Sequence, residues 1–311
     1  MPGYSGTVEG IPKDSLRLDR YVAEELKLLT RSQLKTKLQS ARLNEKPVKL
    51  SRPVKPGDLV ELIWAEPEPL YLLPENIPLN ILYEDARVVV IDKAQGLVVH
   101  PGAGNPSGTL ANALLYRRLN RDGLLSDGAS FDRSFRPGIV HRLDKDTSGV
   151  MIAAYDDAAL SFLADQFKAR RVKKTYGAIV RGTPRENEGI ITTRIVRDSR
   201  DRKRFTVSAD LGVDAPGKPA LTRYRVIRSW GAYSLLLLRP RTGRTHQLRV
   251  HLRHLGHPIL GDPIYGAPDK RFSVPLMLHA RTLSITLPGG EAPSLFKAPL
   301  PERFRTLIGK I

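Results

Sequence analysis

The sequence contains no cysteine, which excludes disulfide bonds, thiolate catalysis and cysteine-ligated zinc or iron–sulfur centres. It also lacks any apolar run long enough to cross a membrane. Its first residues, Met1 to Gly6, do not form the charged and then apolar pattern of a signal peptide. We therefore expect a cytoplasmic protein without membrane association.

The sequence has few acidic residues compared with basic ones: 32 Asp and Glu and 50 Lys and Arg give a formal net charge of +18. Such an excess causes self-repulsion in the folded state and is commonest where a polyanion supplies the counter-charge. Nucleic acid is therefore the expected partner, and a merely basic, soluble surface is the alternative. A length of 311 residues with 41% hydrophobic content predicts two domains with ordinary cores.

The N-terminal part predicts a pair of short helices beside a small sheet. Apolar residues recur at helical spacing from Leu18 to Leu29, and Thr30 to Gln33 forms a capping box that opens a second helix with Leu34 and Leu38 inward. A turn-rich stretch then leads to a strand at residues 59–64. The second helix region is basic, so it is a candidate nucleic-acid contact.

The acidic, proline-rich segment Glu66 to Pro69 fits a linker. We predict an N-terminal module at 1–65, a linker at 66–78 and a larger domain at 79–311. The larger domain should be of the α+β class with a mainly antiparallel or mixed sheet, because its strands and helices do not alternate regularly. The predicted elements are strands at 88–91 and 176–180, helices at 110–119 and 160–171, and an antiparallel pair, 224–227 with 235–238.

The most informative segment is His141 to Gly149, which crowds two carboxylates, a histidine and two cations immediately before the apolar run Val150 to Ala154. This pattern predicts a reactive loop that leads into a buried strand. A solvated charged turn is one alternative. Another is a phosphatase pattern with Asp144 as nucleophile beside Mg²⁺ and Asp146 as acid/base, but that pattern usually has an apolar strand before the first aspartate.

The same segment, His-Arg-Leu-Asp-x-x-Thr-Ser-Gly, resembles the signature of the RluA-type pseudouridine synthases. Further segments match that family in its order: 82–85, 89–93, 96–102, 173–176, 242–251 and 256–262. The chain departs from the family at Ala94 and Gln95, where Pro-Ser or Pro-Ala is usual, which puts a local turn in doubt but no catalytic group. The stretch Leu16 to Leu62 resembles an RNA-binding module shared with a small-subunit ribosomal protein.

The resemblance implies that the bond from uracil nitrogen to the sugar is broken, the base rotates and a carbon bond replaces it, without cofactor or metal. Asp144 is then the catalytic carboxylate, either as nucleophile at the anomeric carbon or as base on the adjacent sugar proton. Arg249 should pair with Asp144 and keep it ionised, since burial alone favours the neutral acid. Tyr176 should stack on the uracil and help remove the proton at the new carbon bond.

The target uridine must leave its stack, and the resemblance assigns Arg142 to the vacated space and Leu278 to an apolar wall behind the base. It also implies further substrate contacts from His141, Thr147, Lys174, Arg244 and His246. In the N-terminal module the RNA-binding candidates are Arg17, Arg31, Lys35 and Arg42. Two basic runs, 168–174 and 194–204, are expected to follow the phosphate backbone.

The segment 247–255 has helical spacing, with Leu248, Leu252 and Leu255 on one face and Arg249 with Arg253 on another. Four histidines at 246, 251, 254 and 257 could suggest a metal, but arginines interleave them, so we expect RNA-facing or structural roles.

The local sequence at residues 98–106 resembles that of the RluD-type members, which modify a stem-loop of large-subunit rRNA. The alternatives are a tRNA or other rRNA site, or a non-catalytic ribosome-assembly factor. We expect a monomer without an obligate protein partner.

Overall fold

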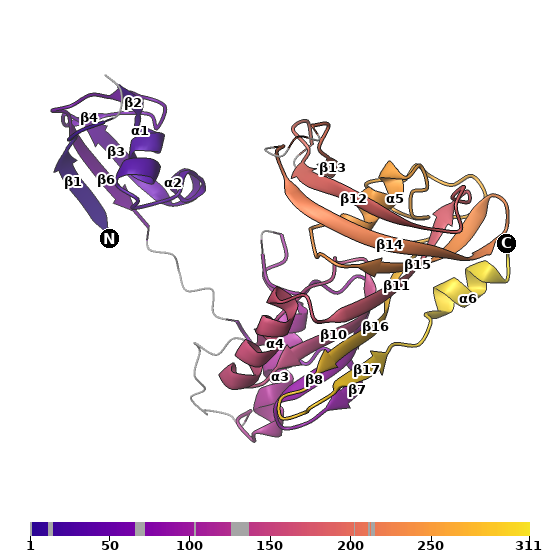
Figure 1. Ribbon diagram of the computed structural model, residues 1–311. Coiled ribbons are helices and arrows are strands. Elements are labelled where there is room, and N and C mark those ends of the chain that lie inside the picture. Colours follow the sequence, from indigo (N-terminus) through magenta and orange to yellow (C-terminus); the bar gives the residue numbers. More distant parts are fainter. Residues whose placement is uncertain are drawn as a thin grey trace. The chain divides into compact units, whose positions relative to one another are not determined.

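The computed structural model describes residues 2–11, 15–65, 72–102, 104–125, 137–201, 203–210, 212 and 215–311. The chain divides into two compact units, residues 1–71 and 72–311 (Figure 1). The predicted linker at 66–78 lies partly outside the described residues, so its bounds remain a prediction. Of the helices in the described ranges, none combines the length and apolar character needed to cross a membrane.

The smaller unit is a four-stranded antiparallel sheet, in the order β1-β6-β3-β4, with a separate strand pair β2-β5 and short helices. Leu34 of helix α2 and Val60 and Leu62 of β6 are buried in one core. The elements are β1 (Gly3–Thr7), β2 (Leu16–Arg17), α1 (Leu18–Arg20), the π-helical turn η1 (Tyr21–Glu25), α2 (Arg31–Lys37), β3 (Leu38–Leu43), β4 (Lys46–Pro47), β5 (Pro53–Val54) and β6 (Leu59–Trp64).

The predicted capping box is confirmed at α2, where the Thr30 side chain accepts from Gln33 N and the Gln33 side chain accepts from Thr30 N. Two helix predictions were wrong in extent. The first helix ends early, because Lys27 adopts a left-handed backbone with φ +52°. Leu38 does not belong to α2: its backbone is already extended, and it begins β3.

The larger unit holds an eleven-stranded sheet, which confirms the α+β class. Its strand order is β13-β12-β14-β15-β11-β16-β10-β8-β7, with β17 beside β16 and β9 beside β10. The elements are β7 (Asn80–Glu84), β8 (Val88–Lys93), α3 (Leu110–Arg121), β9 (Gly138–Ile139), β10 (Ser148–Ala154), α4 (Asp157–Lys168), β11 (Lys173–Arg181), β12 (Glu188–Arg197), β13 (Phe205–Val207), β14 (Lys218–Ser229), β15 (Tyr233–Pro240), α5 (Gln247–His254), β16 (Leu278–Thr286), β17 (Pro293–Lys297) and α6 (Glu302–Ile308).

Helices cover both faces of the β8–β10 part of this sheet. Val89 and Ile91 of β8 pack into the same core as helix α3, whereas Val88 and Val90 pack into the core that contains Leu163 of α4. A strand buried on both faces reads as a continuous apolar run, which explains the sequence of β8 and β10. Every residue of β10 is buried.

The remaining element predictions are confirmed with small shifts in their bounds. Helix α4 begins three residues before the predicted Leu160, because the Asp156 side chain accepts from Ala159 N at 2.7 Å and caps the helix there. It ends at Lys168, before Arg170 turns left-handed at φ +56°. β14 and β15 form the predicted antiparallel pair.

The only parallel contact among the described strands joins β10 to β16, at Ser148–His279 and Gly149–Ala280. Gly149 has φ +120°, and a Cβ there would lie 2.2 Å from the Ala280 carbonyl oxygen. This junction directly follows the loop that contains Asp144, so the close approach of the two strands fixes where that loop ends.

We predict that Gly149→Ala lowers the free energy of unfolding by roughly 2–4 kcal/mol, because the methyl group must push two buried strands apart from a strained backbone. Urea unfolding measures this. Gly177→Ala is the matched control, since a Cβ at Gly177 in β11 meets nothing within 4 Å. Equal stability of the two variants would contradict the constraint.

Candidate active site

Asp144 lies in the loop between β9 and β10, and the side chains of Lys93 and Gln95 hold the backbone of this loop in place. The Thr147 N–H donates to the Asp144 carbonyl oxygen at 3.1 Å and closes a turn. Lys93, at the end of β8, is fully buried, and burial lowers its pKa to about 8. Its ammonium group donates to the backbone oxygens of Ala94, Leu97 and Lys145 at 2.9, 2.8 and 3.0 Å.

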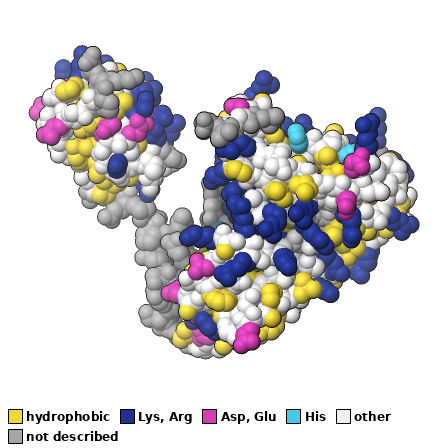
Figure 2. Space-filling view, viewed as in Figure 1, with side chains coloured by type: hydrophobic (Ala, Val, Ile, Leu, Met, Phe, Trp, Pro, Cys, Tyr) yellow, Lys and Arg dark blue, Asp and Glu magenta, His cyan; other side chains and the backbone are white. Residues whose placement is uncertain are grey.

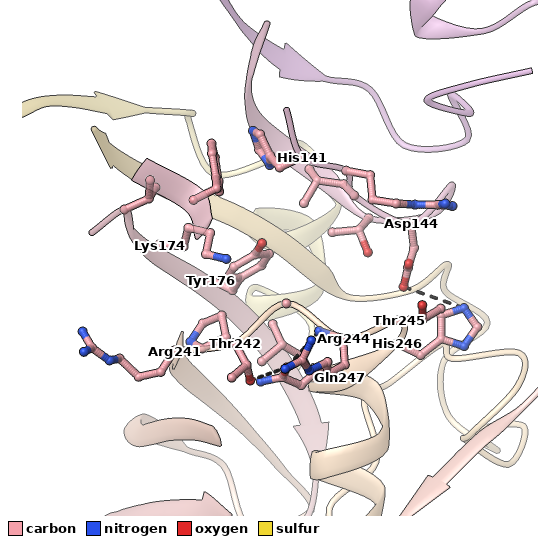
Figure 3. Close-up of a pocket in the computed structure, with 18 of the residues that line it drawn as sticks. His141, Asp144, Lys174, Tyr176, Arg241, Thr242, Arg244, Thr245, His246 and Gln247 are labelled. Atoms are coloured by element: carbon pink, nitrogen blue, oxygen red, sulfur yellow. Dashed lines mark hydrogen bonds and ion pairs between the residues drawn. The ribbon is translucent and has the colours of Figure 1, made fainter. Parts of the chain in front are cut away.

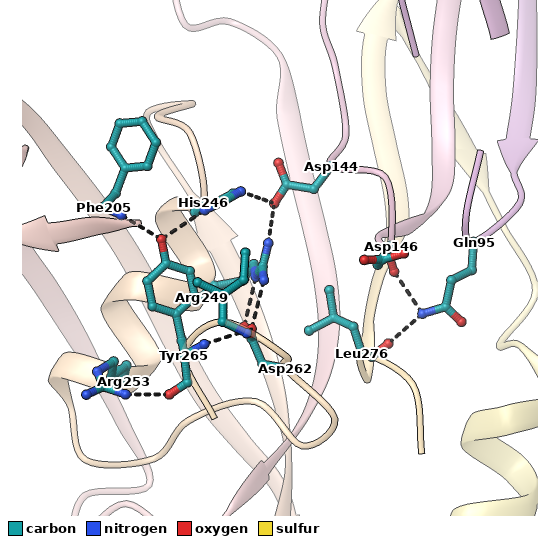
Figure 4. A network of polar contacts seen from close by, with 11 residues as sticks. Gln95, Asp144, Asp146, Phe205, His246, Arg249, Arg253, Asp262, Tyr265 and Leu276 are labelled. Atoms are coloured by element: carbon teal, nitrogen blue, oxygen red, sulfur yellow. Dashed lines mark hydrogen bonds and ion pairs between the residues drawn. The ribbon is translucent and has the colours of Figure 1, made fainter. Parts of the chain in front are cut away.

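Gln95 makes the second contact, which corrects the expectation that the Ala94–Gln95 departure concerns only a local turn. Its Nε2 donates to the Asp146 carbonyl oxygen at 2.9 Å and to the Leu276 carbonyl oxygen at 3.0 Å (Figure 4). The side chain therefore ties the Asp144 loop to the segment that enters β16. A serine or alanine at this position could not reach both carbonyls.

Asp144 opens into a cavity of about 470 Å³, large enough for a nucleotide (Figure 3). Asp144 is the one carboxylate among the described residues that line it. Seven cationic side chains line the same cavity: Arg142, Lys168, Arg170, Lys174, Arg241, Arg244 and Arg249. The site therefore combines a single negative charge with walls suited to a polyanion.

Arg249 of α5 carries the positive charge that faces Asp144. Its Nη1 lies 3.4 Å from Asp144 Oδ2, and the Arg249 side chain is almost fully buried. Its Nε and Nη2 donate to the two oxygens of Asp262 at 2.8 and 2.7 Å, as a bidentate pair (Figure 4). Burial disfavours ionisation of Asp262, but its hydrogen bonds and the charge of Arg249 outweigh this, and the pKa of Asp262 lies below its ordinary value.

Asp262 is thus a functional residue to which the sequence analysis gave no role. It accepts from the backbone N–H groups of Ile264 and Tyr265 as well, so its carboxylate is fixed in place. The signal was present, because a carboxylate between apolar residues such as Leu260 and Ile264 needs a buried partner. Arg249 and Arg253 of α5 both contact Tyr265, as expected for one face of the helix, but Arg249 is buried and Arg253 is exposed.

His246 lies on the other side of Asp144, at the start of α5. Its Nε2 is 3.9 Å from Asp144 Oδ2, and its Nδ1 is 2.9 Å from the Tyr265 hydroxyl. The Tyr265 oxygen already accepts the Phe205 N–H at 2.8 Å, so its own proton is available to Nδ1 (Figure 4). Burial lowers the pKa of His246 although Asp144 opposes this, which favours a neutral ring with its N–H toward Asp144.

Tyr176 and Leu278 come from the neighbouring strands β11 and β16 and contribute the apolar wall of the cavity. Both are buried. Burial, and then the charge of Asp144, raise the pKa of Tyr176, so its phenol remains protonated at neutral pH. Arg142 is exposed at the mouth of the cavity, two residues before Asp144.

The other candidate contacts line the cavity, but several have structural partners. His141 stacks on Phe167 with ring centroids 4.6 Å apart, and its Nε2 accepts the Ile152 N–H. Burial lowers the pKa of His141 to about 3, so the ring is neutral. Arg244 directs its Nε to the Pro219 carbonyl oxygen at 3.0 Å.

Thr147 is buried beneath the cavity, whereas Lys174 is half-buried in its wall. Burial lowers the pKa of Lys174. The loop 242–246 is held by Gln247, whose side chain accepts from Thr242 and from Arg244 N and donates to the Leu221 carbonyl oxygen. The motif residues thus share one rigid frame.

The RNA-binding candidates of the smaller unit are all exposed. Arg17 and Arg31 both form ion pairs with the buried carboxylate of Asp19, at 3.0 Å. These pairs order the two guanidinium groups at the surface. Lys35 and Arg42 lie on α2 and β3 of the same unit.

The four clustered histidines do not converge. His251 is buried and bonds to Thr193 and Thr222, and His257 lies beside the Arg181 carbonyl oxygen. Burial lowers the pKa of His251 to about 4. Across the described ranges, no three His, Asp or Glu side chains are grouped to hold a metal ion.

Comparisons with known proteins agree with this geometry. Residues 87–254 match the family described as RNA pseudouridylate synthase. A protein of Borreliella burgdorferi named "Ribosomal large subunit pseudouridine synthase D" is 43% identical over 302 residues, which are 94% of this chain and 89% of that protein. A Haemophilus influenzae protein of the same name is 37% identical over 100% of this chain and 96% of its own length.

A solved structure, "Human RNA Pseudouridylate Synthase Domain Containing 4", is similar with a TM-score of 0.59 and 30% sequence identity. The similarity covers 74% of this chain and 92% of the human chain. The family match includes the loop of Asp144 and the segment of Arg249, and the relatives and the solved structure cover most of the chain. This chain therefore belongs to the RNA pseudouridylate synthase family, isomerases that act on RNA.

Proposed function

We propose that this protein isomerises specific uridines of large-subunit rRNA to pseudouridine. The observation that carries the proposal is the lone carboxylate of Asp144, held against buried Arg249 in a cavity whose other charged side chains, among the described residues, are cations. The relatives named for the large ribosomal subunit support the choice of target, since they align with nearly the whole chain.

An anomeric carbon cannot be reached inside a stacked helix, so the target uridine must be extruded into the cavity. The cationic walls then contact the phosphates on either side of it. Arg142, exposed at the cavity mouth, is placed to fill the space that the base leaves or to contact a phosphate. Leu278 is placed behind the base as an apolar backing.

Asp144 must be ionised to act, whether it attacks the anomeric carbon or takes the adjacent sugar proton. Desolvation by a bound base would favour the neutral acid, and the guanidinium of Arg249 offsets this. Asp262 takes up two nitrogens of that guanidinium, so that only Nη1 is presented to Asp144. The pair therefore orients Asp144 without capturing both of its oxygens.

The reaction is an isomerisation, so every atom is conserved. The bond from nitrogen 1 to the sugar breaks, a bond from carbon 5 to the sugar forms, and one proton moves from carbon 5 to nitrogen 1. Tyr176, with a phenol that stays protonated, is suited to relay this proton: its oxygen receives the proton from carbon 5 as its own proton passes to nitrogen 1. Its ring also supplies a stacking surface for the base.

The smaller unit, by its resemblance to a ribosomal-protein module and its exposed Arg17, Arg31, Lys35 and Arg42, is proposed to bind RNA outside the cavity. This role is recruitment and involves no chemistry. The enzyme is proposed to act as a monomer.

We predict that Asp144→Asn abolishes pseudouridine formation at its targets, because the amide can neither attack carbon nor accept a proton. Replacing the chromosomal copy and mapping pseudouridines across total RNA tests activity and target together. Missing modifications confined to large-subunit rRNA are expected. A full set of pseudouridines in the Asp144→Asn strain would end the proposal, and loss confined to tRNA would move the target. A growth defect of the gene deletion that Asp144→Asn rescues would instead favour an assembly role.

Tyr176→Phe should keep KM within about threefold and lower kcat by roughly 10²–10⁴, since the ring still stacks while the proton relay is lost. Single-turnover assays on the transcript that contains the mapped uridine separate the two constants. A variant with the wild-type rate would remove Tyr176 from the chemistry.

We expect Asp262→Asn to lower both stability and kcat, because it leaves the buried guanidinium of Arg249 without a counter-charge, at a cost of about 3 kcal/mol. A carboxyl with a lowered pKa in the folded state stabilises above its ordinary pKa of about 3.9 and loses this as the pH falls. The stability gap to wild type should therefore be full at neutral pH and close in acid.

Asp269→Asn is the control for Asp262→Asn. Asp269 forms an ion pair with Arg181 at 3.0 Å but does not line the cavity. This control should lose stability and retain kcat. An Asp262→Asn variant that also retained kcat would contradict the positioning of Arg249 by Asp262.

A further inference from the structure

Within the part of the chain that the structure describes, no helix lies over one face of β12, β14 and β15 (Figure 1). Helix α5 covers the other face, where His251 bonds to Thr193 of β12 and Thr222 of β14. Since side chains alternate along a strand, Arg223 and Arg225 of β14 point away from α5. Figure 1 has α5 behind these strands, and Figure 2, from the same side, has Lys and Arg side chains gathered over the middle of this unit.

The strand register places like charges opposite one another on this open face. Arg223 is the cross-strand partner of Arg239 on β15, and Arg225 is the next outward residue along β14. All three are exposed. Directly opposed like charges destabilise a sheet unless an opposite charge lies nearby. None of these three arginines forms an ion pair with another described residue. Glu188 of β12 is the register partner of Arg225.

The row of arginines runs along the strands toward Arg241, at the strand ends next to the catalytic cavity, whereas Tyr176 of the cavity is in register with Leu238 and Tyr224 and so lies on the α5 face. The β14–β15 ladder extends by a hydrogen bond from Arg241 N to the Leu221 carbonyl oxygen, so Arg241 lies on the same face as Arg239, about 7 Å along the strand. Arg241 also lines the cavity that contains Asp144. We call Arg241, Arg239, Arg223 and Arg225 the arginine tract. A shallow depression lies along Arg239, Arg223 and Arg225 and is also lined by Glu188 and the exposed side chain of Ile190.

We propose that the arginine tract binds the sugar–phosphate backbone of the RNA helix that flanks the target uridine. This inference rests on the proposed function. An RNA whose uridine occupies the cavity reaches this face around the strand ends at Arg241, and its phosphates supply counter-charge beyond that of Glu188, the register partner of Arg225. Guanidinium groups suit this contact because they bind phosphate oxygens in a bidentate manner.

The smaller unit of this chain is a poor occupant of the tract. Residues 1–65 carry 12 Lys and Arg against 8 Asp and Glu, so the two surfaces have the same sign. A protein of the ribosomal particle is a further candidate, which the experiment separates from RNA.

The test compares Arg223→Ala/Arg239→Ala with Lys297→Ala/Lys310→Ala. The control removes the same charge from exposed lysines of β17 and the end of the chain that have no recorded ion pair. The probe is a stem-loop transcript around the uridine that the Asp144→Asn strain leaves unmodified. Kd is measured at salt concentrations between about 50 and 200 mM, a range over which the release of counterions changes the affinity measurably. The constants kcat and KM are measured in the same buffer.

For the tract variant we expect Kd and KM about tenfold above wild type, an unchanged kcat, and a slope of log Kd against log salt that is smaller by about 2, one for each lost phosphate contact. The control should match wild type. Trimming the RNA stem to its loop should weaken wild-type binding to the level of the tract variant, and should affect the variant little.

A tract variant with wild-type Kd and salt slope on the intact stem would overturn the inference. So would a defect on the assembled ribosomal particle without one on the transcript, since that outcome assigns the face to a protein. Failure of the proposed function is read separately: wild-type protein would then leave the transcript unmodified, while the binding comparison would still report on the tract.

Discussion

The structure depends on one buried guanidinium shared by two carboxylates. Arg249 gives Asp262 two short hydrogen bonds and faces Asp144 with the third nitrogen at 3.4 Å. A buried cation needs a partner, and Asp262 meets that need in full. Arg249 therefore remains charged and fixed whether or not Asp144 is engaged with RNA. The reactive carboxylate can change its contacts during a reaction cycle without exposing an uncompensated charge.

The loop that holds Asp144 is rigid for a different reason. Lys93 and Gln95 donate hydrogen bonds to backbone carbonyls of the loop. These hydrogen bonds therefore do not depend on which side chains the loop carries. The close approach of Gly149 to Ala280 fixes its far end. Reactive groups on loops act at defined positions only when the scaffold determines the backbone, and three independent contacts do so here.

Charge is distributed over this protein in two distinct ways. Beside Asp144, Arg249 is buried and paired with Asp262, and Lys174 is half-buried with a pKa that burial lowers. Along the sheet face, Arg223 and Arg239 are exposed and opposed to one another. The first arrangement sets the chemistry of one carboxylate. The second contributes little to folding and is consistent with a surface completed by a polyanion.

The sequence alone determined the local elements and the identity of the reactive loop. The spacing of apolar residues and the capping box located α2, α3 and the β14–β15 pair, because these signals depend only on a few neighbouring residues. The family resemblance supplied the pairing of Arg249 with Asp144, but the sequence could not supply the contacts of Gln95 with Leu276 or of Asp262 with Arg249. Hydrogen bonds between distant segments depend on how the sheet brings their strands together, and periodicity carries no information about that. Tertiary structure therefore decided which carboxylate the arginine holds and which it presents to the substrate.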